Sequence, residues 1–370
     1  MSDAPLEPFI LLAEPDHYRA CEWDFTTDSE ARNYWVPLLL RNFEVTLQIA
    51  AEADLSEGRD AEDTEQRISA CHAALHGRMQ AYLNDPSHYG RVTILTLDRW
   101  RTEILRSFGF FDPYRLFKRR ENERVLPLLK PWCDRLDAMH PDERALAVVE
   151  GVLAGNIFDM GAEATARQFA HAPPDFEQVR RKLPSRPWLL DDFESLAPRL
   201  TRHFSVGGVF RKVVFFIDNA GSDFVLGAVP LARAMALGGG EVVLVANASP
   251  TLNDMTLAEV ESLWPELCRR LPDLARLPVM RVSSGTGEPV IDLSAVSAEL
   301  NAASAGADLV LLEGMGRGVE SNLHVRMRCD RLNLAMIKDP FVAARHGGKL
   351  YDCVCVYRPL SGGVAAVRSD

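Results

Sequence analysis

A carboxylate and a carboxamide stand together at the end of a strongly apolar segment of this 370-residue chain. Residues 213–217, Val-Val-Phe-Phe-Ile, have the composition of a strand covered on both faces, and Asp218 and Asn219 follow directly. Such groups must find water, hydrogen-bond donors or a metal ion, because burying them unpaired is costly. The alternative is that Asp218 caps a helix and Asn219 fills a turn, the ordinary role of an isolated Asp-Asn pair.

Polar residues also follow the other predicted strands of the second half. Those at or just beyond the carboxyl ends are Asp218, Asn219, Asn247, Asp254, Glu313, Arg317 and Lys338. Parallel strands bring these ends to one edge of a sheet, where ligands bind in open α/β folds. We therefore expect side chains that are far apart in the sequence to lie together there.

The residue types at this edge suit a metal ion and a phosphate. Asp218, Asn219 and Asp254 offer oxygen ligands with no His or Cys beside them, which favours a hard divalent cation over zinc. Arg317 and Lys338 suit phosphate oxygens, and the glycines of Gly314-Met315-Gly316 would let backbone N–H groups approach an anion. The alternative for residues 313–317 is a tight turn with an exposed ion pair.

Several phosphate-handling classes are excluded by missing motifs. The chain has no G-x-x-x-x-G-K-[ST] loop, and no G-x-G-x-x-G follows the strand at 213–217. Ala220 stands where a haloacid-dehalogenase phosphatase would carry its second Asp, and no serine-nucleophile elbow is present.

Two periodicities divide the chain. Up to about residue 200 a helical period dominates, with stripes at Ile68, Cys71, Leu75, Met79, Tyr82 and at Ile94, Leu97, Trp100, Ile104. Pro-rich breaks between residues 172 and 198 predict a connection rather than continuous regular structure. We therefore predict a mainly helical part over 1–200 and an α/β domain over 201–370.

The second half alternates strands with helices, as in a mostly parallel sheet. Strands are predicted at 213–217, 241–246, 279–283, 308–312, 332–337 and 350–357. Helices are predicted at 224–237, 257–268 and 293–304.

Composition narrows the class of partner. Lys plus Arg number 41 against 52 Asp plus Glu, a net charge of −11, which does not favour nucleic acid or an anionic membrane. Residues 1–8 lack a signal-peptide pattern, and no apolar run is long enough for a membrane helix. Seven cysteines without disulfide-like or zinc-like spacing fit reduced thiols, so a cytoplasmic protein is expected.

Several short motifs stand out in both halves of the chain. The motifs in the second half are Asp218-Asn-Ala-Gly-Ser-Asp223, Asn253-Asp254, Glu313-Gly-Met-Gly-Arg317 and Leu334-Ala-Met-Ile-Lys338. Those in the helical half are Phe111-Asp-Pro-Tyr114, Arg119-Arg-Glu-Asn122, Ala154-Gly-Asn-Ile-Phe-Asp159 and Arg186-Pro-Trp-Leu-Leu-Asp191. These motifs resemble those of the damage-control metal phosphatases, formerly domain of unknown function 89. The resemblance is greatest to subfamily II, which includes stand-alone plant proteins and the phosphatase domain of pantothenate kinase 4, and it covers most of the chain.

The resemblance implies a helical amino-terminal part leading into a Rossmann-like α/β/α sandwich. It further implies metal-dependent hydrolysis of small phosphomonoesters, with manganese, cobalt, nickel or magnesium as the metal. By position, Asp218, Asn219 and Asp254 match metal ligands, whereas the loop 313–317 and Lys338 match phosphate contacts. The implied substrates are 4′-phosphopantetheine and its oxidised or damaged forms, with sugar phosphates as weaker ones.

Some features stay open at this level. The acidic residue five positions after Asp218 is Glu in much of the family and is Asp223 here. The side chains of Asn156 and Asp159 either reach the site or form capping and core hydrogen bonds. Asp218, Asp254 or Asp223 is expected to act as nucleophile or base, or a metal-bound water attacks. Competing interpretations are a Rossmann-like carboxyl methyltransferase and a non-catalytic metabolite-binding regulator. The oligomeric state is not predicted.

Overall fold

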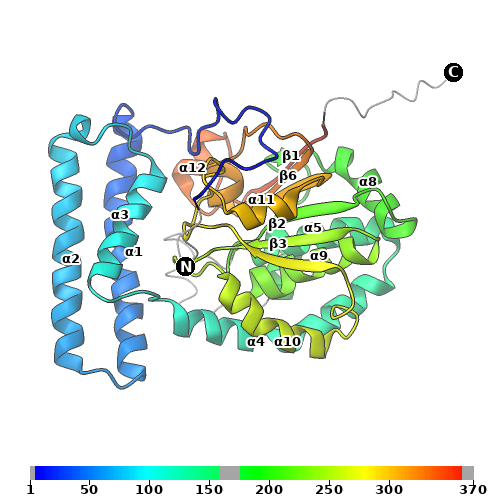
Figure 1. Cartoon of the computed structure of the whole chain (residues 1–370), viewed down its shortest axis with the longest axis horizontal. Helices are drawn as coiled ribbons and strands as arrows, with labels where there is room; N and C mark the ends of the chain where they lie inside the picture. Colours follow the sequence, from blue (N-terminus) through cyan, green and yellow to red (C-terminus); the bar gives the residue numbers. More distant parts are fainter. Residues whose placement is uncertain (1–4, 158–175, 361–370) are drawn as a thin grey trace.

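In the computed structural model, which describes residues 5–157 and 176–360, seven strands form one sheet in the order β1-β7-β6-β5-β2-β3-β4 (Figure 1). The strands are β1 (Leu190–Asp191), β2 (Lys212–Phe216), β3 (Glu241–Ala246), β4 (Val279–Ser283), β5 (Leu309–Glu313), β6 (Asp330–Met336) and β7 (Cys353–Arg358). All neighbouring pairs are parallel except β6 and β7. The predicted mixed fold with a mostly parallel sheet is confirmed.

The helices of the first half are α1 (Ser29–Ser56), α2 (Ala61–Asn84), α3 (Ile94–Ser107), α4 (Arg115–Ala138), α5 (Pro141–Gly155), α7 (Phe176–Arg181) and α8 (Phe193–Ser205). Those of the second half are α9 (Val229–Leu237), α10 (Leu257–Arg270), α11 (Ala298–Ser304) and α12 (Pro340–Arg345). Short 3₁₀ or π turns are η1 (Pro86–Tyr89), η2 (Asp223–Ala228) and η3 (Gly316–Glu320).

The apolar runs arise because both faces of the sheet are covered. Along β2, Val213 and Phe215 join a core with α5, α8 and α9, whereas Val214 and Phe216 join a core on the opposite face. That second core includes Phe9 and the helix α11. A strand with two buried faces has no polar alternation, which is the pattern that the sequence shows.

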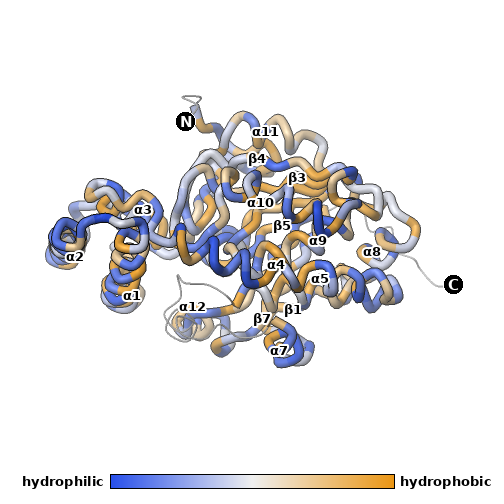
Figure 2. Tube along the Cα trace, turned by 90° about the horizontal axis from the view of Figure 1, so that it is seen from below, coloured by the Kyte–Doolittle hydropathy of each residue, from blue (hydrophilic) through white to orange (hydrophobic). Residues whose placement is uncertain are grey.

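Helices α1, α2 and α3 stand beside the sheet as a separate layer (Figures 1 and 2). The predicted stripe on α2 is buried at Cys71, Leu75, Met79 and Tyr82. The layer is flanked in the sequence by segments that belong to the sheet body: residues 9–12 pack on the sheet before it, and α4 follows it along the sheet body.

Three predicted elements differ from the structure. The Pro-rich region is an irregular connection only in part. Residues 182–189 form no helix or strand, as predicted, whereas α7, β1 and α8 lie on either side of them and β1 extends the sheet by pairing with β7. The first predicted break, at residues 172–175, lies outside the described residues. Pro198 lies inside α8 without ending it. The helix predicted at 293–304 begins only at Ala298, because backbone groups of Leu293 and Val296 bond to the segment at residues 7–9. The helix predicted at 224–237 begins as the π turn η2 and continues as α9.

No helix among the described residues is long and apolar enough to cross a membrane.

The order of the strands marks one binding edge. From β2 the chain continues to β3 on one side, whereas β5 lies on the other side of β2. This is a topological switch point, at which the carboxyl ends of the strands leave a crevice.

Candidate metal and phosphate site

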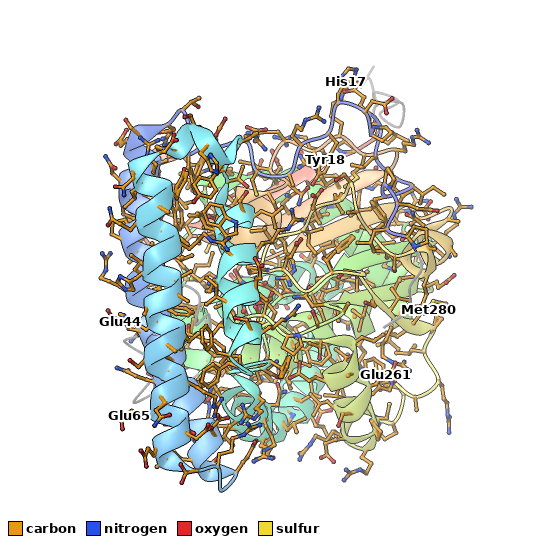
Figure 3. All side chains as sticks on the ribbon, turned by 60° about the vertical axis from the view of Figure 1, so that its left-hand side comes forward. His17, Tyr18, Glu44, Glu65, Glu261 and Met280 are labelled. Carbon is orange, nitrogen blue, oxygen red and sulfur yellow. The ribbon has the colours of Figure 1, made fainter. Side chains whose placement is uncertain are left out.

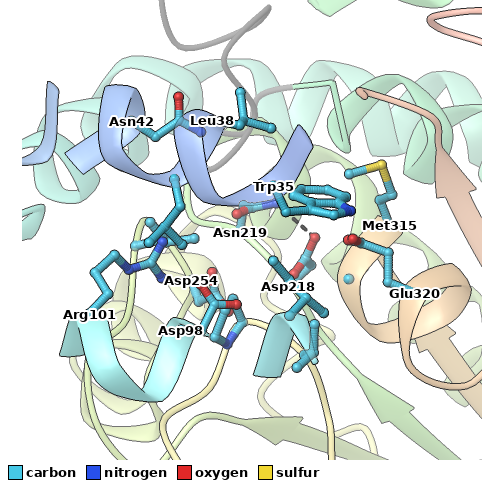
Figure 4. A pocket seen from close by; sticks show the side chains of 16 residues that line it. Trp35, Leu38, Asn42, Asp98, Arg101, Asp218, Asn219, Asp254, Met315 and Glu320 are labelled. Carbon is cyan, nitrogen blue, oxygen red and sulfur yellow. Dashed lines mark hydrogen bonds and ion pairs between the residues drawn. The ribbon is translucent and has the colours of Figure 1, made fainter. Parts of the chain in front are cut away.

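The crevice beyond β2 holds the three predicted metal ligands. Asp218 and Asn219 follow β2, and a backbone bridge joins Asn219 to Asp254, which lies in the loop after β3. All three side chains are buried and line one cavity (Figure 4). Residues 35 positions apart in the sequence thus meet because their strands are neighbours.

The carboxylates of Asp218 and Asp254 both face the guanidinium of Arg317. The guanidinium of Arg317 donates to Asp218 Oδ1 and, at 2.6 Å, to Asp254 Oδ2. Asn247 completes the group: its Oδ1 accepts from Arg317 at 3.2 Å and its Nδ2 donates to Asp254 Oδ2 at 3.2 Å. Carboxylate and amide oxygens that converge in this way fit a hard divalent cation. Arg317 thus lies against the predicted ligands.

Two carboxamides hold the carboxylates in place. Asn219 Nδ2 donates to Asp218 Oδ2 at 2.8 Å and to Asp223 Oδ2 at 3.0 Å. Asn156 Nδ2 makes the same pair of bonds, both at 3.0 Å. The residue from the helical half therefore reaches the site and fixes the orientation of Asp218. Asp159, its predicted companion, lies outside the described residues.

A buried charge network lies beneath these groups. Lys338 Nζ donates to the Asn156 carbonyl oxygen at 2.8 Å and to its Oδ1 at 3.2 Å, and Glu313 Oε2 accepts from the Asp218 N–H at 3.2 Å. Burial raises the pKa of Asp223, and this effect outweighs the positive charge of Lys338, which lowers that pKa. Burial and the neighbouring Asp223 raise the pKa of Glu313 well above its usual range. Lys338 thus supplies positive charge to a site rich in carboxylates.

The loop after β5 approaches the ligands closely. Gly314 has φ +96°, and a Cβ at this position would overlap the Asp218 carboxylate. A Cβ on Gly316 would lie 2.7 Å from the Pro289 carbonyl oxygen. The two glycines therefore let the backbone pass beside Asp218, and Met315 and Gly316 line the cavity.

The opposite wall of the cavity comes from the helical layer. Trp35 and Asn42 of α1 and Asp98 and Arg101 of α3 face the sheet edge (Figure 4). Arg101 Nη2 lies 3.0 Å from Asp98 Oδ1, and burial raises the pKa of Asp98 to about 6. This wall was not predicted from the sequence. A signal was available, since Asp98 and Arg101 fall on the buried stripe of α3, where charged residues are uncommon.

The helical half also supports the ligand loop from below. The Gly221 N–H donates to Asn122 Oδ1 of α4 at 2.7 Å, and Asn122 is buried. The π turns η2 and η3 begin directly after the loops beyond β2 and β5. Such turns are frequent at functional sites.

A model of the ARMT1-like domain of damage-control phosphatases matches residues 42–354. This chain belongs to that family. The resemblance predicted from the motifs is confirmed. A DUF89 family protein from Pyrococcus horikoshii superimposes with a TM-score of 0.57 at 17% identity, covering 89% of this chain and 98% of that one. The fold class is therefore shared with that family.

Curated relatives of this damage-control phosphatase family member fall into two groups by length. A damage-control phosphatase of Arabidopsis thaliana is 34% identical, over 95% of this chain and 97% of its own length. Pantothenate kinase 2 of Arabidopsis thaliana is 37% identical and the mouse 4′-phosphopantetheine phosphatase 31%, each over 96% of this chain. The chain spans 42% and 49% of those two proteins, about half of their length.

Proposed function

We propose that this protein is a metal-dependent phosphomonoester hydrolase that acts on small phosphometabolites, and foremost on 4′-phosphopantetheine and its oxidised or damaged forms. The observation that carries the proposal is the convergence of the buried Asp218 and Asp254 carboxylates on one cationic group at the carboxyl edge of the sheet. Membership of the damage-control phosphatase family supports the same reaction class.

Asp218, Asn219 and Asp254 would hold the divalent metal, for which manganese, cobalt, nickel and magnesium are the candidates. Held by these residues, the metal would supply Lewis-acid polarisation of a phosphate oxygen and a lowered pKa of water. Arg317, placed between Asp218 and Asp254, would turn its guanidinium to the outer phosphate oxygens, and Lys338 would contribute charge from behind Asn156. Glu313, Gly314, Met315 and Gly316 would shape the phosphate pocket.

The three candidate catalytic carboxylates have different positions. Asp218 and Asp254 line the cavity, so either one can reach a substrate as base or nucleophile. Asp223 is fully buried, and its Oδ2 accepts from both Asn219 and Asn156. We propose that Asp223 positions the two carboxamides and that proton transfer falls to Asp218 or Asp254.

The helical wall would recognise the organic part of the substrate. Trp35 offers an apolar face, and its buried indole N–H has no acceptor among the described residues. Arg101 and Asn42 add polar groups at the same wall. A 4′-phosphopantetheine chain presents amide carbonyls and hydroxyls that match such donors, and the name of the mouse relative supports this substrate.

A cytoplasmic location is part of the proposal. All seven cysteines are free thiols, as expected in a reducing compartment. The net charge of −11 supports a small metabolite rather than nucleic acid as the partner.

The test is phosphate release from a panel of 4′-phosphopantetheine, its oxidised forms and sugar phosphates. Each substrate is assayed with manganese, cobalt, nickel, magnesium or a chelator. We expect release that depends on the metal and is highest with 4′-phosphopantetheine or an oxidised form. Absence of activity with every metal would overturn the proposed reaction, and tight binding of S-adenosylmethionine would favour a methyltransferase instead.

A further inference from the structure

Two histidines and a glutamate gather on the helical layer, apart from the cavity. Glu44 of α1 and His72 and His76 of α2 each place one ligand atom so that all three atoms lie within 4.8 Å of one another. His72 Nε2 is 3.8 Å from Glu44 Oε1, and the two imidazole centroids are 4.1 Å apart. Small side-chain rotations would bring the three atoms to the distances of one bound ion.

The helix geometry explains this cluster and separates it from the cavity. His72 and His76 are four positions apart on α2, so their side chains share one face of the helix. Glu44 follows the cavity residue Asn42 by two positions, a turn of roughly 200° around α1, and its side chain therefore points away from the cavity. In Figure 3, Glu44 lies with Glu65 on the helical side of the molecule, opposite Glu261 and Met280.

One ring nitrogen of His76 lacks a hydrogen-bond partner within the described part of the chain. Its Nε2 atom is buried and has no hydrogen-bond partner among the described residues. Glu44 and His72 remain accessible to a cation from solvent.

We propose that Glu44, His72 and His76 form a second metal site, for a borderline cation such as zinc, nickel or copper. Two imidazoles and one carboxylate are the donors that such ions prefer, in contrast to the all-oxygen set at the sheet edge. Three protein ligands leave one position for water. Because the ligands come from α1 and α2, the bound ion clamps these two helices together and stiffens the layer that carries Trp35 and Arg101. This site does not depend on the proposed phosphatase activity.

The experiment titrates zinc into the full-length protein, freed of metal with a chelator, in competition with a chromophoric chelator. The wild type is compared with His72→Ala, His76→Ala and Glu44→Gln. Matched controls are His88→Ala and Glu65→Gln, both exposed residues outside the cluster. Asp254→Asn removes a ligand of the sheet-edge site instead, so the two sites are counted separately.

We expect one zinc ion whose affinity falls at least about tenfold in each histidine variant and is unchanged in the controls and in Asp254→Asn, since loss of a direct ligand costs no less than loss of a supporting group. Copper loaded at one equivalent should show hyperfine coupling to two nitrogens in its electron paramagnetic resonance spectrum. This coupling should be reduced in His72→Ala, which keeps only the imidazole of His76. Equal zinc stoichiometry and affinity in wild type and both histidine variants would overturn the proposal. So would the absence of any zinc bound independently of Asp254.

Discussion

The two walls of the central cavity are built on different principles. The sheet-edge wall includes the short side chains of Asp218, Asn219 and Asp254, which lie in the loops after β2 and β3 and are fixed by the backbone and by mutual hydrogen bonds. The helical wall consists of side chains that project from helix faces, among them the long side chains of Trp35 and Arg101. The first arrangement suits a reaction that needs fixed geometry. The second suits recognition, which tolerates adjustment.

The variant Asp254→Asn removes one of the two converging carboxylates of the sheet-edge wall and should have the largest effect. We expect turnover to fall by about 10³-fold, because metal binding and charge stabilisation are both lost. The measurement is phosphate release with saturating metal, beside thermal unfolding to show an intact fold. Asp134→Asn, on the exposed surface of α4, is the matched control. Normal release by Asp254→Asn would remove it from the site.

On the helical wall, Asp98→Asn tests the buried ion pair. The pKa of Asp98 is raised to about 6 from an ordinary 3.8, so the folded state binds this proton more tightly than the unfolded state does. Wild-type stability therefore falls as pH rises from about 4 to 6, by about 3 kcal/mol at 1.4 kcal/mol per unit. The variant lacks this fall. Denaturant unfolding of both proteins at pH 4 and pH 7 measures it, and parallel stability curves would contradict the assignment.

Gly314→Ala tests whether the sheet-edge wall needs exact backbone placement. The added methyl group overlaps the Asp218 carboxylate and stands at φ +96°, so Asp218 or the loop must move. We expect kcat to fall by about 100-fold, the cost of a displacement of about 1 Å at a reacting centre. Gly77→Ala, which meets nothing within 4 Å, is the control. A kcat equal to that of the control would mean that this wall adjusts as freely as the helical one.

Arg101→Met should have the smallest effect of the four. If the helical wall recognises substrate, removing this charge raises KM about tenfold with little change in kcat, as for a lost hydrogen bond to a charged group. The steady-state kinetics of 4′-phosphopantetheine hydrolysis measure this split, with Arg119→Met on exposed α4 surface as control. A large loss of kcat with unchanged KM would place Arg101 in the chemical step. It would contradict the assignment of substrate recognition to the helical wall.

The location of the sheet-edge wall could be predicted from the sequence, because its residues lie at the carboxyl ends of strands. Asp218, Asn247, Glu313 and Lys338 each follow an apolar run, and parallel pairing brings those ends together. The strands predicted at 241–246 and 279–283 match β3 and β4 residue for residue. A continuous apolar run bounded by polar residues is a strong local pattern, and it predicts a buried strand together with its end. The specific roles of these residues remain predictions.

The helical wall was missed because it depends on packing between distant elements. Trp35 reads as an ordinary core residue of α1 until the position of that helix over the sheet edge is known. The edge strand β1 was not predicted for a related reason. Two residues carry no periodic pattern, and they become a strand only by pairing with β7. The bonds from residues 7–9 that shorten the helix at 293–304 are equally remote in sequence.

The placement of α1–α3 has an evolutionary consequence. Residues 9–12 and α4 both belong to the sheet body, so the layer between them enters and leaves that body as one uninterrupted stretch of chain. It carries seven of the residues that line the cavity and none of the proposed ligands at the sheet edge. A lineage could therefore exchange this stretch by recombination or accumulate substitutions in it, and acquire new substrates while inheriting its reaction centre unaltered.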